Sequence, residues 1–229
     1  MDKLNLDQHI SRHFNEELEQ IKTQLLTMGG LVEAQVTDAV NALLNADSAL
    51  AQEVISREAT IDAMELEIDE DCTNIIVRRQ PAASDLRMVR AVTHAVGDLE
   101  RIGDEAKKIA KMAIKLAEEG SAPGGYVELR HIANSVRKMV NDSLDAFARY
   151  DADVAEETHR ADKQVDMDYK SAMREMITYM MEDPRSITRV MNVIWALRSL
   201  ERVGDHAKNI CEQVIYLVRG KDIRHRRDD

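Results

Sequence analysis

Two stretches of the chain, LERIGDEAKKIA at residues 99–110 and LERVGDHAKNIC at residues 200–211, agree at eight of twelve positions. The likeness extends upstream. Residues 37–62 align with residues 141–166 at an offset of 104, whereas the two quoted stretches are offset by 101. Self-similarity over this length is the mark of a duplicated structural unit. The sequence therefore predicts one unit present twice, with a turn region three residues shorter in the second copy.

The composition, together with the positions of helix-breaking and capping residues, predicts that each unit is a bundle of three long helices. Aromatic residues make up only 3% of the chain and prolines number three, which is typical of helical bundles with aliphatic cores. After the first helix, the second is predicted at about 49–79. The third runs from about 84 to the stretch EEGSAPGGY at 118–126. The last three are predicted at about 126–149, 151–182 and 184–219. Short turns make successive helices antiparallel. The expected fold is all-α, with two tandem three-helix bundles at 1–120 and 121–220, a disordered tail at 221–229, and a kink at Gly29-Gly30.

The hydrophobic pattern, net charge and cysteine content exclude several classes of protein. No apolar run approaches the ~18 residues of a membrane span, and the N-terminal residues lack the apolar segment of a signal peptide. A net charge of −11 argues against nucleic-acid binding. Cys72 and Cys211 lie within helical patterns, which predicts buried free thiols and fits a reducing cytoplasm. We therefore expect a cytoplasmic protein, not inserted in a membrane, whose partners are cations or basic protein surfaces.

Acidic side chains recur in pairs four residues apart, at matching depths in both copies. The pairs are Glu58 with Asp62 and Glu100 with Asp104 in the first copy, and Asp162 with Asp166 and Glu201 with Asp205 in the second. A spacing of four places both side chains on one helix face. The members of the pairs that are nearest to the prolines lie at similar distances along the chain. Asp62 and Glu100 lie 19 residues before and after Pro81, and Asp166 and Glu201 lie 18 residues before and 17 after Pro184. In antiparallel helices hinged at those prolines, the pairs come level, so each bundle gathers four carboxylates.

Four carboxylates with no histidine or thiolate between them predict a site for a hard cation. Oxygen ligands suit magnesium, calcium, manganese and iron better than zinc or copper. We expect divalent or ferric ions, with iron, magnesium, manganese and zinc as the candidates. Arg101 and Arg202 are the expected salt-bridge partners of the acids. Gly103 and Gly204, inside the motifs, predict that another group approaches the helix backbone closely.

Other interpretations compete with the metal site. Acid pairs four apart also occur on ordinary solvated helix faces, so a plain helical scaffold stays open, as does a bundle that stores iron or other cations. A di-iron enzyme needs two Glu-x-x-His pairs that face each other. Glu128 with His131 and Glu156 with His159 would lie ~25 Å apart along the bundle axis, which excludes that class. The sequence contains no phosphate-binding glycine loop and no nucleophile elbow.

Three further side chains are assigned on general grounds. Glu65 extends the acidic stripe, but Tyr169 stands at its position in the second copy, so we expect a surface charge. His206 is expected to be an exposed histidine. Trp195, together with the methionines at helical spacing, is expected to lie in the core.

The duplicated L-E-R-[IV]-G-D motif, together with RRQPAASDLRMVRA at 78–91, resembles the PhoU family of accessory proteins of bacterial phosphate-specific transport. The resemblance covers essentially the whole chain. It implies a non-enzymatic, cytoplasmic negative regulator of the phosphate-starvation response. It also implies that the protein couples the importer ATPase PstB to the sensor kinase PhoR, and that it forms a homodimer. Metal, including multinuclear iron clusters, is implied on the eight paired acids.

The second copy departs from the first just before its motif. Thr188 and Met191 stand where the first copy has Arg87 and Arg90. We therefore expect the two halves to hold metal alike and to meet different partners, because any contact through these arginines is present in one half only.

Overall fold

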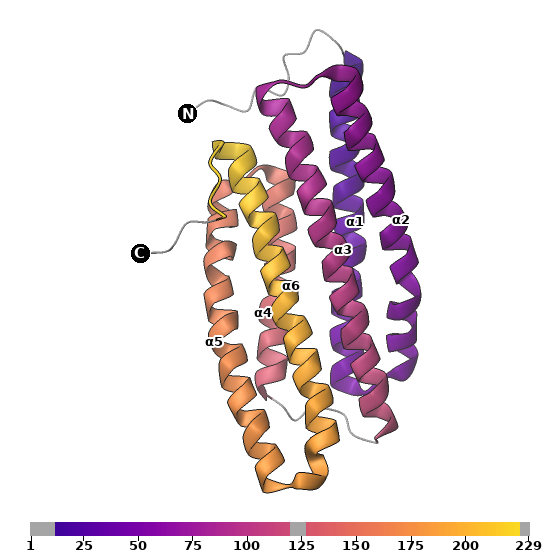
Figure 1. The fold of residues 1–229 in the computed structure, drawn as a ribbon, viewed down its shortest axis with the longest axis vertical. Coiled ribbons are helices and arrows are strands. Elements are labelled where there is room, and N and C mark those ends of the chain that lie inside the picture. The colour runs from indigo at the N-terminus through magenta and orange to yellow at the C-terminus, as the bar shows by residue number, and fades with distance from the viewer. Residues whose placement is uncertain (1–11, 120–126, 225–229) are drawn as a thin grey trace.

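The computed structural model describes residues 12–119 and 127–224, which form six long α-helices and no strand (Figure 1). The helices are α1 (Arg12–Asn45), α2 (Ser48–Arg79), α3 (Ala83–Glu118), α4 (Val127–Arg149), α5 (Ala152–Glu182) and α6 (Ile187–Arg219), with a 3₁₀ turn, η2 (Pro184–Ser186), before α6. The all-α prediction with two three-helix units is confirmed. The proline that was expected to open the sixth helix instead opens η2.

The first turn of each unit has the same local structure. Asp47 and Asp151 cap α2 and α5, because one carboxylate oxygen of each accepts from the backbone N–H groups two and three residues ahead, at 3.0 Å. The residues before them, Ala46 and Tyr150, adopt φ of 53° and 54°. The duplication is therefore visible in backbone geometry as well as in sequence.

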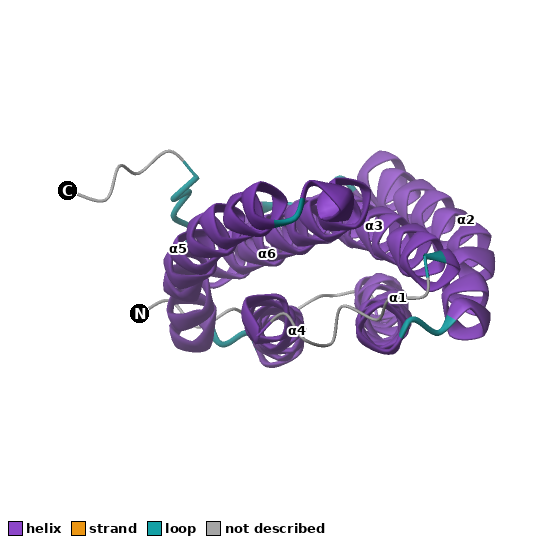
Figure 2. Cartoon of the chain, turned by 90° about the horizontal axis from the view of Figure 1, so that it is seen from below, coloured by secondary structure: helices purple, strands orange, loops and turns teal. Residues whose placement is uncertain are grey.

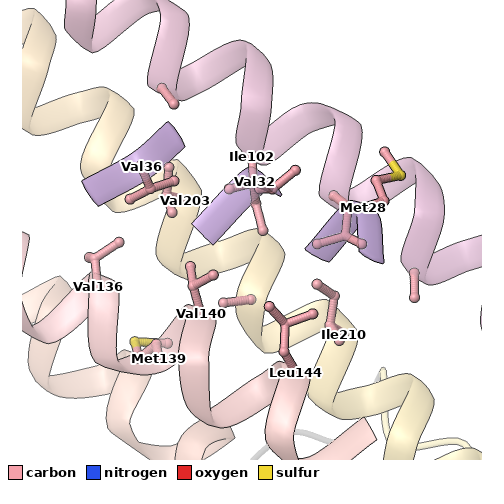
Figure 3. Packing of buried hydrophobic residues seen from close by; sticks show 14 of the residues in the cluster. Met28, Val32, Val36, Ile102, Val136, Met139, Val140, Leu144, Val203 and Ile210 are labelled. Atoms are coloured by element: carbon pink, nitrogen blue, oxygen red, sulfur yellow. The ribbon is translucent and has the colours of Figure 1, made fainter. Parts of the chain in front are cut away.

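The helices lie in two layers that share one core. Figure 2 shows α5, α6, α3 and α2 in one row, with α4 and α1 against it. The two units meet where α3 packs on α6 and α1 packs on α4. Side chains of all four central helices meet between the layers, among them Val36, Ile102, Val136, Val140 and Val203 (Figure 3). The two repeats, as described over 12–119 and 127–219, thus pack around one continuous hydrophobic core.

The glycine pair in α1 does not interrupt the helix, which runs through both residues. A Cβ atom at Gly29 would lie 2.5 Å from Cδ2 of Leu144 on α4, whereas one at Gly30 would meet nothing within 4 Å. The pair therefore does not end the helix, and the weak point or kink stays a prediction. Gly29 allows α1 and α4 to approach each other closely.

One side-chain assignment changes, and the assignment of the two cysteines is confirmed. Trp195 is 53% exposed on α6, so its expected place in the core is wrong. Cys72 and Cys211 are buried and free, as predicted. Residues 221–224 of the expected tail are described, and Ile223 packs against the core; residues 225–229 lie outside the described part of the chain. Within the described residues, no helix is long and apolar enough to cross a membrane.

Candidate metal centres

The first acidic cluster lies between α2 and α3 and is centred on a buried carboxyl. Glu58 is only 4% exposed and accepts a hydrogen bond from Gln35 Nε2 at 3.2 Å. Its Oε1 has no donor, but Asp104 is placed to accept a hydrogen bond once Glu58 is protonated. Burial, and then this contact with Asp104, raise the pKa of Glu58 to about 7. The two helices therefore hold one carboxyl in a state that favours a proton or a cation.

The other acids of the first unit lie beside this carboxyl at the interface of α2 and α3. Burial and then the charges of Asp104 and Asp62 raise the pKa of Glu100. Burial, followed by the charge of Glu100, also raises the pKa of Glu65. The prediction that the two pairs come level is confirmed, because they influence each other across the helix interface. Glu65, expected to be a separate surface charge, in fact adds a fifth acid beside this cluster.

The second cluster repeats the arrangement between α5 and α6. Asp162, which corresponds to Glu58, is 3% exposed and accepts a hydrogen bond from Lys208 Nζ at 2.6 Å. Burial and then the charge of Asp162 raise the pKa of Asp205. Burial and then the charges of Asp205 and Asp166 raise the pKa of Glu201. Each unit therefore gathers its four predicted acids, with one of them fully buried.

The donor chemistry of both clusters fits a hard cation. Burial, and then neighbouring carboxylates, raise the carboxyl pKa values in each, and Glu58 has a buried oxygen without a donor. Lys208 supplies the balancing charge in the second cluster, and its counterpart Lys107 lies 3.9 Å from Asp104 Oδ1 in the first. Among the described residues, no three acidic, histidine or cysteine side chains already converge on one point suited to an ion. Metal binding would require the carboxylates to rotate and the lysines to move aside.

The motif glycines differ between the two units. A Cβ atom at Gly103 would lie 3.3 Å from Cδ1 of Ile61, which is a tight contact. At Gly204 the nearest atom would be Asp162 Oδ1, at an ordinary 3.7 Å. The predicted close approach to the backbone is therefore present at Gly103, where α2 packs against α3, and absent at Gly204.

Comparison with known proteins agrees with this duplicated architecture. A family model described as PhoU domain matches twice, at residues 25–113 and 129–214. The chain belongs to the PhoU family. The phosphate-specific transport system accessory protein PhoU homolog of Pseudomonas aeruginosa is 61% identical over 225 residues, covering 98% of this chain and 93% of that protein. The PhoU of Escherichia coli (strain K12) is 47% identical with the same coverage.

Solved PhoU structures have the same fold. The crystal structure of PhoU from Pseudomonas aeruginosa superposes with a TM-score of 0.89 at 62% identity, covering 91% of this chain and 100% of that one. The structure of the phosphate transport system regulatory protein PhoU from Streptococcus pneumoniae gives 0.84 at 30% identity, with coverage of 91% and 98%. The fold of the family is thus kept at low identity.

In this PhoU-family chain both clusters open onto one groove between the repeats. The groove, of about 760 Å³, follows the seam of α3 and α6, and its lining includes Asp104 from one cluster and Asp205 from the other. Arg101 and Arg202 both line it. Arg101 influences the first cluster, since its charge offsets part of the rise that burial and then Asp104 and Asp62 cause in the pKa of Glu100. The two expected metal centres are therefore neighbours across the seam.

Arg202 and His206 make polar contacts between the two repeats. Arg202 Nη1 lies 3.2 Å from Glu105 Oε1 on α3, so its salt bridge crosses the seam and does not reach a cluster acid. His206 Nδ1 lies 2.9 Å from Asp98 Oδ1, which also accepts from Asn209 Nδ2 at 3.0 Å. The side chain of His206 is only 16% exposed. The expectation of an exposed histidine is therefore wrong.

Proposed function

We propose that this chain is a non-enzymatic, cytoplasmic regulator of phosphate homeostasis that represses the phosphate-starvation response by linking the importer ATPase PstB to the sensor kinase PhoR. The observation that carries the proposal is the match, over 98% of the chain, to relatives named as accessory proteins of phosphate-specific transport. The function named for these relatives is assistance to a transporter, and an adaptor made of long, rigid helices suits that role.

The proposed mechanism uses metal ions at Glu58, Asp62, Glu100 and Asp104 and at the matching acids of the second unit. A hard cation would neutralise each cluster and tie α2 to α3, and α5 to α6. The support is that burial, and then neighbouring carboxylates, raise the carboxyl pKa values in both units. Two stiffened helix pairs would then present fixed surfaces to the partners.

The regulatory proposal is tested by deleting the gene. Phosphate-starvation genes should be expressed in phosphate-rich medium, and a plasmid copy of the gene should restore repression. A pull-down from the complemented strain should recover the sensor kinase and the importer ATPase. Unchanged expression after deletion would overturn the proposal.

Metal binding has its own test, which also separates a structural site from iron storage. Elemental analysis of the purified protein should give a small whole number of ions per chain, lost in the double variant Asp104→Asn/Asp205→Asn. The control is Glu53→Gln/Glu157→Gln, which removes one exposed acid from matched positions of each unit. Many reversibly loaded ions per chain would favour storage. Metal content that does not change in the first variant would overturn these assignments.

We also propose that the protein acts as a homodimer. Exposed apolar side chains follow one another at four-residue spacing on α6, at Ile187, Met191 and Trp195. An exposed apolar stripe of this kind is typical of a contact surface between proteins. Light scattering on the purified protein should give twice the chain mass, and a monomer at all concentrations would contradict this part of the proposal.

A further inference from the structure

A second pocket, of about 620 Å³, lies far from the expected metal centres, at the end of the molecule where the α4–α5 turn meets the start of α3 and the end of α6 (Figure 1). Its lining includes three arginines: Arg87 from α3, Arg149 from the end of α4 and Arg219 from α6. The arginines come from three elements and from both repeats. Three guanidinium groups thus meet at one place in a chain whose net charge is −11.

Arg87, which lines this pocket, has an unused donor. Its Nε is buried and has no hydrogen-bond partner, and its guanidinium lies beside Gly220, just beyond the end of α6. A buried donor without an acceptor is costly, so native proteins seldom keep one. Because this Nε has almost no accessible surface, the side chain would have to turn for an oxyanion in the pocket to supply the missing acceptor.

The other two arginines pair with carboxylates that are exposed or half-buried. Arg149 Nη2 lies 2.9 Å from Asp145 Oδ2, and its side chain is 72% exposed. Arg219 bridges Asp153, at 2.6 Å, and Glu156, and its side chain is 37% exposed. Exposed ion pairs of this kind contribute little because water screens both charges. Both guanidinium groups can therefore turn toward a more highly charged ligand.

The arginines are not needed to build this end of the molecule. The opposite end has the same turn geometry, with its own capping aspartate and positive-φ residue. The repeat offsets place Asn45, Thr188 and Glu118 at the positions of Arg149, Arg87 and Arg219. All three cations are missing there, and one is replaced by an acid. Since the fold forms equally at both ends, the arginine set calls for an explanation other than packing.

We propose that this pocket binds a phosphoryl group, either as inorganic phosphate or as the phosphate of a small ester. Guanidinium groups match the geometry of phosphate oxygens through paired N–H donors, better than a lysine could. The volume is within the usual range for small-molecule sites, so it admits a phosphate with an attached organic group. The site does not depend on the carboxylate clusters and stands or falls separately from them.

Calorimetric titration of the full chain, in EDTA and at low salt, tests the proposal with inorganic phosphate, AMP and adenosine. Phosphate or AMP should bind, and whichever binds more tightly identifies the free or the esterified form. Arg87→Gln should weaken binding at least tenfold. Arg149→Gln, a change on the exposed surface that leaves the fold intact, should weaken it too. The matched control is Arg57→Gln, since Arg57 also bridges two acids but lies outside the pocket.

Three results would overturn the proposal: no binding of either phosphate compound to the wild-type chain, equal binding by adenosine and AMP, or unchanged affinity in both pocket variants. Circular dichroism on each variant shows that the loss of affinity comes from a folded protein. If Arg87 served only to stabilise the end of α6, its replacement would lower the melting temperature while the wild-type chain bound no phosphate.

Discussion

The buried carboxyl of Glu58 should make the cation-free protein less stable at mildly basic pH than at mildly acidic pH. Its pKa rises from 4.5 to about 7 on folding, through burial and then through the contact with Asp104. A raised pKa means that the folded state holds the proton more tightly than the unfolded state. This contribution to stability is fully present below pH 4.5 and is lost as the pH rises through 7.

The size of the effect follows from the two pKa values. A rise from 4.5 to about 7 corresponds to ~3 kcal/mol at about 1.36 kcal/mol for each pKa unit. Because the unfolded carboxyl is already partly ionised at pH 5, we expect a loss of ~2 kcal/mol between pH 5 and pH 8. The raised pKa of Glu100 acts in the same direction, whereas the lowered pKa of Glu105 acts in the opposite one.

The variant Glu58→Gln isolates this contribution. Glutamine can accept from Gln35 and donate to Asp104, as protonated Glu58 does. Urea unfolding in EDTA should show the variant about as stable as wild type near pH 5 and ~2 kcal/mol more stable at pH 8. Glu53→Gln, an exposed acid on the same helix, should follow the wild-type pH profile. Parallel stability profiles for Glu58→Gln and wild type would refute the reasoning.

Three further variants and one reagent test the packing and the charges of the fold. Gly30→Ala should stabilise the protein by about 1 kcal/mol in urea unfolding, because its Cβ meets open space. Gly29→Ala should destabilise it by ~1–2 kcal/mol, because its Cβ would lie 2.5 Å from a leucine methyl carbon; equal effects would contradict the packing of α1 on α4. Burial raises the pKa of both thiols, Cys72 and Cys211, so a thiol reagent should label them only after unfolding, and fast labelling of the native protein would contradict their burial. Asp162→Asn should cost ~1–2 kcal/mol, because it removes the carboxylate that accepts from a partly buried ammonium, and an unchanged midpoint would show that this ion pair is unimportant.

The helices and the depth of the acid clusters could be predicted because their signals are local. Prolines, capping aspartates and apolar spacing act within a few residues, and they mark the turns on which the register of each hairpin depends. Once Pro81 and Pro184 are recognised as hinges, counting residues outward places the acids opposite each other. The structure confirms that arrangement in both units.

The packing of one repeat against the other could not be predicted from these signals. Nothing in either unit alone says which helices meet, so the contacts of Arg202 and His206 across the seam were missed. Trp195 was predicted to be buried because sequence alone does not show which side of an apolar helix faces the core. In the structure its side chain is exposed. The sequence did contain one clue: Glu105 is replaced by His206 in the second copy, and Asp98 by Ser199. Positions 98 and 105 are seven residues, or about two helical turns, apart and so lie on one face of α3. In the structure this is the face that meets the other repeat.

The seam also determines which halves can pair. Glu105 contacts Arg202 and Ser199 of the second repeat, and His206 of the second repeat contacts Asp98 of the first. Two first repeats joined in the same way would place Glu105 against Asp98, acid against acid. Two second repeats would leave His206 facing a serine. After duplication, the halves have become complementary and no longer interchangeable, so separately produced halves should assemble as unlike pairs.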